Sequence, residues 1–142
     1  MFREKRRVER IKIRVPVSVL LLNDKTDTIL AGPVEGEARD FSPMGFALSL
    51  GNIMIEHYHL FFTCQDNPAH ILIIGFKPPG GQEPAMEVPA RPVWYDRDKE
   101  SSEKKALLGL KFLLAPKDEV IKKLTKKLFA AEKTPSSWWK IF

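Results

Sequence analysis

The residues in this chain that are best suited to chemistry are two arginines near its start and a short acidic turn further along. Arg6 and Arg10 stand four positions apart, and Asp40, Ser42 and Gly45 follow in an Asp-x-Ser-x-x-Gly pattern. Guanidinium groups donate hydrogen bonds in a planar fork that matches phosphates and the acceptor edge of guanine. A carboxylate accepts from the other edge of that base, a hydroxyl donates or accepts, and glycine provides a positive φ or a close backbone approach. These residue types can together hold a guanine base and a phosphate group.

Each motif also has an ordinary explanation when it is taken alone. Arginines at this spacing recur throughout so basic a segment, where a solvated arm accounts for them, and the acidic motif can be a plain Asx or Ser turn between two strands. The two motifs nevertheless occur in a suitable order, with 29 residues between Arg10 and Asp40. That length accommodates one strand, a turn and a returning strand, which would bring the two motifs together.

Hydrophobic residues alternate with polar ones along most of the chain, which predicts β-strands. The first strand follows the arginine pair and runs from Ile11 to Leu21, with Pro16 indicating an edge position or a bulge. The stretch from Asp96 to Lys105 is densely charged and predicts an exposed hairpin loop. Many short strands separated by turn signals are typical of an all-β sandwich or barrel. The other predicted strands share the same alternation and are Val34–Asp40, Phe46–Leu50, Tyr58–Cys64, His70–Phe76, Met86–Trp94 and Leu108–Phe112.

The end of the chain changes to a helical period. Val120, Leu124 and Leu128 fall on one side and lysines on the other, which predicts an amphipathic helix over residues 117–132. We expect the apolar stripe to pack on the β-domain. Two alternatives stay open for the lysine face and the aromatic end around Trp138: contact with an anionic membrane surface, which we do not favour, and a homodimer contact.

Composition is that of a single-domain globular protein. The 142 residues, 44% of them hydrophobic, suffice for one domain with a core. No apolar run reaches the roughly 20 residues of a membrane span, and no apolar segment follows the charged start as it would in a signal peptide. The single cysteine, Cys64, cannot form an internal disulfide, and its place on an apolar strand face predicts a buried thiol. We therefore expect a cytoplasmic protein.

The net charge of +5 is spread unevenly along the chain. Residues 1–14 hold seven lysines and arginines against two glutamates, and residues 115–142 hold seven lysines against three acidic residues. The middle of the chain is consequently acidic overall. Two basic ends on an acidic body predict that one end or both contact an anion, although basic termini also occur simply because they keep a protein soluble.

The sequence offers little support for an enzyme or a metal centre. No paired-carboxylate motif, Ser-His-Asp set or glycine-rich phosphate loop stands out, so we expect a binding module with no catalytic residue. His57 and His59 fall on one face of a predicted strand, with His70 nearby, and such a pair could serve as metal ligands. Exposed strand histidines are the simpler interpretation, and we expect no metal.

The two motifs together resemble the PilZ family of cyclic di-GMP receptors. The family pattern is an Arg-x-x-x-Arg arm followed by (Asp/Asn)-x-Ser-x-x-Gly, and Pro92-Val93-Trp94 and Gly109-Leu110-Lys111-Phe112 look like its closing strands. The resemblance extends over residues 6–114. It implies an all-β fold, an antiparallel Greek-key β-barrel of about six or seven strands with a C-terminal amphipathic α-helix. The parts would be a flexible basic arm, the barrel, and the helix with an aromatic tail, at residues 1–10, 11–114 and 115–142.

The resemblance also implies a function. Cyclic di-GMP would be the ligand, with no cofactor, and its binding would order the arm and signal to a downstream protein partner. Arg7 and Arg14 would add to the positive field around the ligand. Motility, exopolysaccharide secretion and transcription all fit as the regulated process. The residues implied to bind the ligand are those of the two motifs, Arg6, Arg10, Asp40, Ser42 and Gly45.

Two other functions are compatible with the same residues. The first is a basic nucleic-acid-binding β-barrel, which would use both termini with Trp94 and Tyr95 as a charged and stacking surface. The second is a PilZ-fold interaction module that has lost ligand binding. The intact pair of Arg6 and Arg10 argues against the second alternative, and we expect no specific nucleic acid as a partner.

Overall fold

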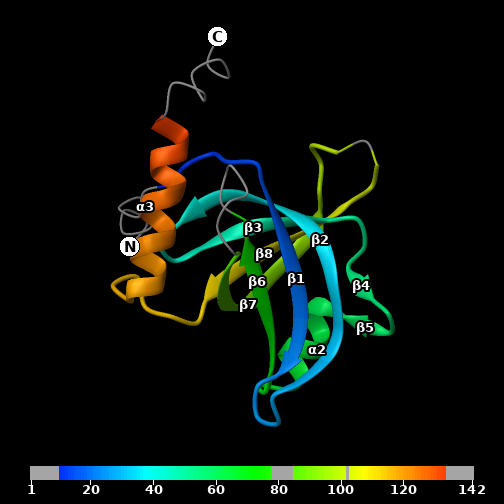
Figure 1. Cartoon of the computed structure of the whole chain (residues 1–142). Helices are drawn as coiled ribbons and strands as arrows, with labels where there is room; N and C mark the ends of the chain where they lie inside the picture. Colours follow the sequence, from blue (N-terminus) through cyan, green and yellow to red (C-terminus); the bar gives the residue numbers. More distant parts are fainter. Residues whose placement is uncertain (1–9, 78–84, 102, 134–142) are drawn as a thin grey trace, which may run out of the picture.

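The computed structural model describes residues 10–77, 85–101 and 103–133 and shows a closed antiparallel barrel (Figure 1). Its strands close in the order β1-β2-β3-β8-β7-β6. A small hairpin of β4 (Met54–Ile55) and β5 (Tyr58–His59) leads into helix α2 (Leu60–Asp66), and helix α3 (Glu119–Lys133) follows the last strand. The predicted fold class, a six-stranded β-barrel with a C-terminal helix, is thereby confirmed. The barrel strands are β1 (Val15–Asn23), β2 (Thr28–Ser42), β3 (Gly45–Leu50), β6 (His70–Phe76), β7 (Met86–Arg97) and β8 (Ala106–Phe112).

Four phenylalanine rings fill the core near the turn between β2 and β3. Phe41 and Phe46 each lie against Phe76 and Phe112, with ring centroids 5.2 to 6.2 Å apart. All four side chains are buried. Alternation of apolar residues predicts this for Phe46 and Phe112, whereas Phe41 lies beyond the predicted strand, at the register shift in β2. Strand β1 is not an edge strand of the closed barrel, but Pro16 lies at its end and pairs with β2 only, because the pairing of β1 with β6 begins at the next residue. The core therefore fixes the strands that carry the acidic turn.

The segment Tyr58–Cys64 is not a strand, contrary to the sequence prediction. Only its first two residues are extended, and α2 begins at Leu60. The ring of His59 caps this helix, because its Nδ1 accepts a hydrogen bond of 3.2 Å from the backbone N–H of Phe62. Leu60 and Cys64 stand four residues apart, a spacing that fits one face of a helix as well as one face of a strand. Both are buried, which confirms the predicted burial of the thiol, whereas Phe62 is exposed.

Helix α3 begins later than predicted and leaves one residue of its predicted apolar stripe exposed. The carboxylate of Asp118 accepts a hydrogen bond of 2.9 Å from the backbone N–H of Val120 and so caps the first turn. Ile121, Leu124 and Leu128 are buried against the barrel. Val120, which the sequence assigned to the packing stripe, is exposed, because steps of four residues drift around a helix of 3.6 residues per turn. Across the described residues no helix combines the length and the apolar character that crossing a membrane requires.

Most described residues from Asp96 to Lys105 are exposed, as predicted, but the start of the loop and one of its residues need correction. Strand β7 continues to Arg97, which pairs with Ala106 of β8, and the following residue, Asp98, is only 1% exposed. A charged residue is buried here because its partners come from strands far away in the sequence. Residues 1–9, 78–84, 102 and 134–142, including the predicted tail tryptophans Trp138 and Trp139, lie outside the described residues.

The partners of Asp98 make up a buried ion pair with supporting hydrogen bonds. Arg39 Nη1 donates a hydrogen bond of 3.0 Å to Asp98 Oδ1, and Arg39 Nη2 lies 3.0 Å from Asp98 Oδ2 in the ion pair. The Ser49 hydroxyl donates at 2.7 Å and the backbone N–H of Glu100 at 3.1 Å. Burial raises the pKa of Asp98, but these hydrogen bonds and the charge of Arg39 outweigh it and hold that pKa below its usual value. The ion pair ties the end of β7 to β2 and β3.

We predict that this ion pair makes the fold sensitive to acid. Because the pKa of Asp98 is lower in the folded chain, the unfolded chain binds the extra proton, and the stabilisation present above about pH 4 is lost as the pH falls through the folded-state value. Asp98→Asn leaves Arg39 without its main partner and should lower the free energy of unfolding by about 3 kcal/mol at neutral pH. Urea unfolding of both proteins, at neutral pH and near pH 3, measures this difference.

The difference between the wild type and Asp98→Asn should shrink on acidification. Asp96→Asn is the matched control, because Asp96 is exposed and its removal should change stability little at either pH. A difference between Asp98→Asn and the wild type that is the same at both pH values would contradict the assigned linkage.

Candidate functional site

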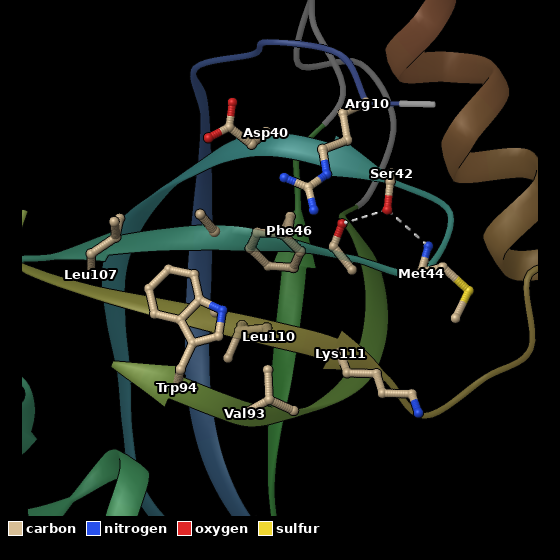
Figure 2. Close-up of a pocket in the computed structure, with 13 residues that line it drawn as sticks. Arg10, Asp40, Ser42, Met44, Phe46, Val93, Trp94, Leu107, Leu110 and Lys111 are labelled. Carbon is tan, nitrogen blue, oxygen red and sulfur yellow. Dashed lines mark hydrogen bonds between the residues drawn. The ribbon is translucent and has the colours of Figure 1, made fainter. Parts of the chain in front are cut away.

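The amino-terminal segment reaches the acidic turn through one pair of backbone hydrogen bonds. Ile11 and Phe41 exchange N–H to carbonyl bonds in both directions, each 2.9 Å long. Because Phe41 is fully buried among the core rings, the core fixes the position of this contact. Arg10 and Asp40 precede the bonded residues, and both line one hollow of 440 Å³ on the barrel surface (Figure 2). The structure therefore brings together the described parts of the two sequence motifs.

Asp40 stands out of the strand ladder at a bulge. The pairing of β2 with β3 shifts register between Arg39 and Ser42. Asp40 has a φ of 51°, in the left-handed region that aspartate and asparagine tolerate better than most residues. It is exposed and forms no hydrogen bond with the rest of the described chain. The bulge thus leaves an unpaired carboxylate at the rim of the hollow.

Ser42 and Gly45 build the turn that follows the bulge. The Ser42 hydroxyl accepts a hydrogen bond of 3.1 Å from the backbone N–H of Met44 and donates one of 3.4 Å to the carbonyl oxygen of Gly45 (Figure 2). The φ of Gly45 is not positive, but a β-carbon there would collide with the carbonyl oxygen of Leu110 in β8. Of the two roles that the sequence allows this glycine, the structure selects close backbone approach. A ligand contact by Ser42 stays a prediction.

The floor of the hollow comes from β7 and β8. A β-carbon at Gly109 would collide with the indole of Trp94, so this glycine lets the ring lie close to β8. In Figure 2 the guanidinium of Arg10 extends over Phe46 on the side that faces Trp94, while Lys111 lies at the other rim. Neither Phe46 nor Lys111 is among the site residues predicted from the sequence motifs. No local feature of the sequence points to Lys111. Its place follows from the register of β3 and β8, in which Lys111 pairs with Gly45 of the acidic turn.

The arginines of the amino-terminal segment have different surroundings. Arg10 forms no hydrogen bond or ion pair with any other residue that the structure describes, so its donors are available to a ligand. Arg14 lies outside the hollow and pairs with Glu37 at 2.9 Å and with Glu100 at 3.3 Å. These two carboxylates balance the positive charge of Arg14, which was expected to add to the positive field around the ligand. The other two predicted arm residues, Arg6 and Arg7, lie outside the described residues.

The three histidines have other partners within the fold. His59 caps α2, and His70 lies 2.9 Å from the Thr63 hydroxyl and 3.2 Å from the side-chain amide of Asn67. His57 is exposed and packs against the neighbouring tyrosine ring. Among the described residues no group of three or more histidine, cysteine or acidic side chains is arranged to hold a metal ion.

Comparisons with known proteins add no family assignment. No protein-family model matches the chain, and neither the curated proteins nor the solved structures give a match. The PilZ resemblance therefore rests on the sequence pattern, and the function that it implies is a proposal.

We predict that the turn cannot accept a side chain at Gly45. Gly45→Ala places a β-carbon against the backbone carbonyl of Leu110, which cannot move without disturbing the pairing of β3 with β8. This variant should lower the free energy of unfolding by about 2 kcal/mol. Gly51→Ala is the matched control, because no atom of the described residues lies within 4 Å of a β-carbon at that position. Urea unfolding compares the two, and equal losses would show that the contact with Leu110 does not constrain the turn.

Proposed function

We propose that this protein is a cyclic di-GMP receptor of the PilZ type, which acts in the cytoplasm through a protein partner and catalyses no reaction. The observation that carries the proposal is the backbone contact between Ile11 and Phe41, because it sets Arg10 and Asp40 at one hollow. The hollow has a volume of 440 Å³, within the range of about 300–1,000 Å³ that is typical of small-molecule sites.

The unpaired groups in the hollow match the chemistry of a guanine nucleotide. Arg10 can donate to the O6 and N7 acceptors of guanine or to a phosphate, and Asp40 can accept from the N1–H and N2 groups. Neither side chain must first give up a partner among the described residues, so binding breaks no internal hydrogen bond at these two groups. The indole of Trp94 is 45% exposed and offers an aromatic surface for a base, and Lys111 adds positive charge for a phosphate.

Calorimetry with cyclic di-GMP tests this proposal. We expect micromolar or tighter binding, weakened about tenfold or more by Arg10→Ala and by Asp40→Ala, because a bidentate contact to a base is worth about 1–3 kcal/mol. Arg14→Ala is the matched control, an arginine of the same segment whose partners are Glu37 and Glu100. This substitution should change the Kd for cyclic di-GMP about twofold at most, since exposed ion pairs contribute little free energy.

Two calorimetric results would contradict the receptor function. One is the absence of binding by the wild type, and the other is binding that neither Arg10→Ala nor Asp40→Ala weakens. A steeply salt-dependent binding of unrelated oligonucleotides, without preference for the cyclic dinucleotide, would instead favour a nucleic-acid-binding barrel.

The second arginine of the arm gives a separate prediction. A ligand with two phosphodiester charges calls for a second guanidinium, and Arg6 stands four residues before Arg10. We expect ligand binding to fix residues 3–10 across the hollow, so their backbone amide relaxation in NMR should change at saturating cyclic di-GMP. Unchanged relaxation of these amides, with ligand bound, would reject the ordering of the arm.

A further inference from the structure

Four aromatic rings gather on the outer surface of the protein where α2 packs against β7. We name this set, His59, Phe61, Phe62 and Tyr95, the aromatic patch. Tyr95 lies at its centre, with ring centroids 5.0 Å from Phe61, 5.2 Å from His59 and 5.6 Å from Phe62. Phe62 is 47% exposed and Tyr95 is 43% exposed, so the patch faces solvent and does not belong to the buried core.

The surroundings of the patch extend its apolar character. Met54 of β4 pairs with His59 of β5, which places both side chains on one face of the hairpin, and Met54 is itself exposed. Contiguous apolar surface costs free energy in water and is a recurrent mark of protein interaction sites. Methionine is common on such surfaces because its flexible side chain adapts to a partner.

A basic hollow adjoins the aromatic patch and shares Tyr95 with it. This hollow has a volume of 580 Å³ and is lined by three cationic side chains, Arg97, Lys104 and Lys105, against one carboxylate, that of Asp96. Lys105 has an acidic neighbour at 3.6 Å, but Arg97 and Lys104 form no ion pair with any residue in the described part of the chain. Their positive charge is therefore open to a partner.

We propose that the aromatic patch and the basic hollow together bind a partner protein through an acidic segment that carries apolar anchor side chains. Charge complementarity selects an acidic segment for the hollow, and the rings supply the apolar contact that dominates protein interfaces. The ring geometry favours a protein over a nucleic acid. Tyr95 lies edge-on to His59 and Phe62, at interplanar angles of 77° and 76°, so these rings contact one another and do not form a flat platform for stacked bases.

This surface is distinct from the nucleotide hollow, because successive residues of a strand point to opposite faces. Trp94 lines the first hollow and Tyr95, the next residue of β7, belongs to the aromatic patch. A register shift between Pro92 and Trp94 accompanies the exposure of both rings. The docking surface goes beyond the proposed receptor function and does not rest on it, because the peptide experiment below contains no nucleotide.

A random peptide library displayed on phage tests this proposal on the full chain. Clones are selected on the wild type after depletion on the double variant Phe62→Ser/Tyr95→Ser, and the enriched peptides are synthesised for titration by NMR. We expect these peptides to combine acidic with aromatic or aliphatic residues and to shift the resonances of α2 and β7. Phe62→Ser and Lys104→Glu should each weaken binding about tenfold, and added salt should weaken it further.

The matched control is Ile29→Ser, which removes another exposed apolar side chain, here from β2 and outside the aromatic patch. It should leave peptide affinity unchanged. Far-UV circular dichroism and thermal melting confirm that each variant is folded, and Tyr95→Ser replaces Phe62→Ser if the latter fails. Enrichment of no peptide, enrichment of basic or purely polar peptides, or equal losses in Ile29→Ser would each overturn the proposal. A single-stranded oligonucleotide that shifts the same resonances more strongly than any peptide would also overturn it.

Discussion

Two backbone hydrogen bonds between Ile11 and Phe41 determine the geometry of the candidate site. They tie the amino-terminal segment, whose Ile11 and Ile13 side chains also pack against the core, to a fully buried residue of the core. The bulge at Asp40 lies beside this tie, so the acidic group and Arg10 have positions that the barrel sets and the segment alone could not. A backbone tie beside the acidic turn lowers the ordering cost that a ligand must overcome on binding.

The two acidic residues near this bulge show how burial and pairing divide structure from function. Asp98 is buried and receives hydrogen bonds from Arg39, Ser49 and a backbone N–H, so its charge is satisfied within the fold. Asp40 is exposed, and no described residue pairs with it. The first arrangement stabilises the connection between strands, and the second leaves a hydrogen-bond acceptor open to a ligand. The same side chain, aspartate, thus stabilises the fold at one position and is open to a ligand at the other, because its surroundings differ.

Much of the barrel could be predicted from the sequence, because a strand that is buried on one face repeats its apolar residues at every second position. Phe46 of β3 and Phe112 of β8 follow this rule, whereas Phe41 of β2 departs from it because it lies at a register shift. Helix α2 could not be predicted, since Leu60 and Cys64 fit both periods and the cap is an unusual histidine. The burial of Asp98 depends on Arg39, which lies 59 positions away and carries no local signal. For the site, the order and spacing of the motifs predicted that Arg10 and Asp40 lie close together, and both line one hollow, whereas the hydrogen bonds of the Ser42 hydroxyl are visible only in three dimensions.

The close approach of Trp94 to Gly109 has a consequence for how this surface can change through evolution. Adding a methyl group to the glycine while the large ring is present forces a steric conflict, whereas trimming the ring first opens the space. Loss of the indole before substitution of the glycine is consequently the order in which no ring has to move, a form of epistasis between neighbouring strands. A side chain gained at Gly109 while Trp94 is present would have to displace the indole.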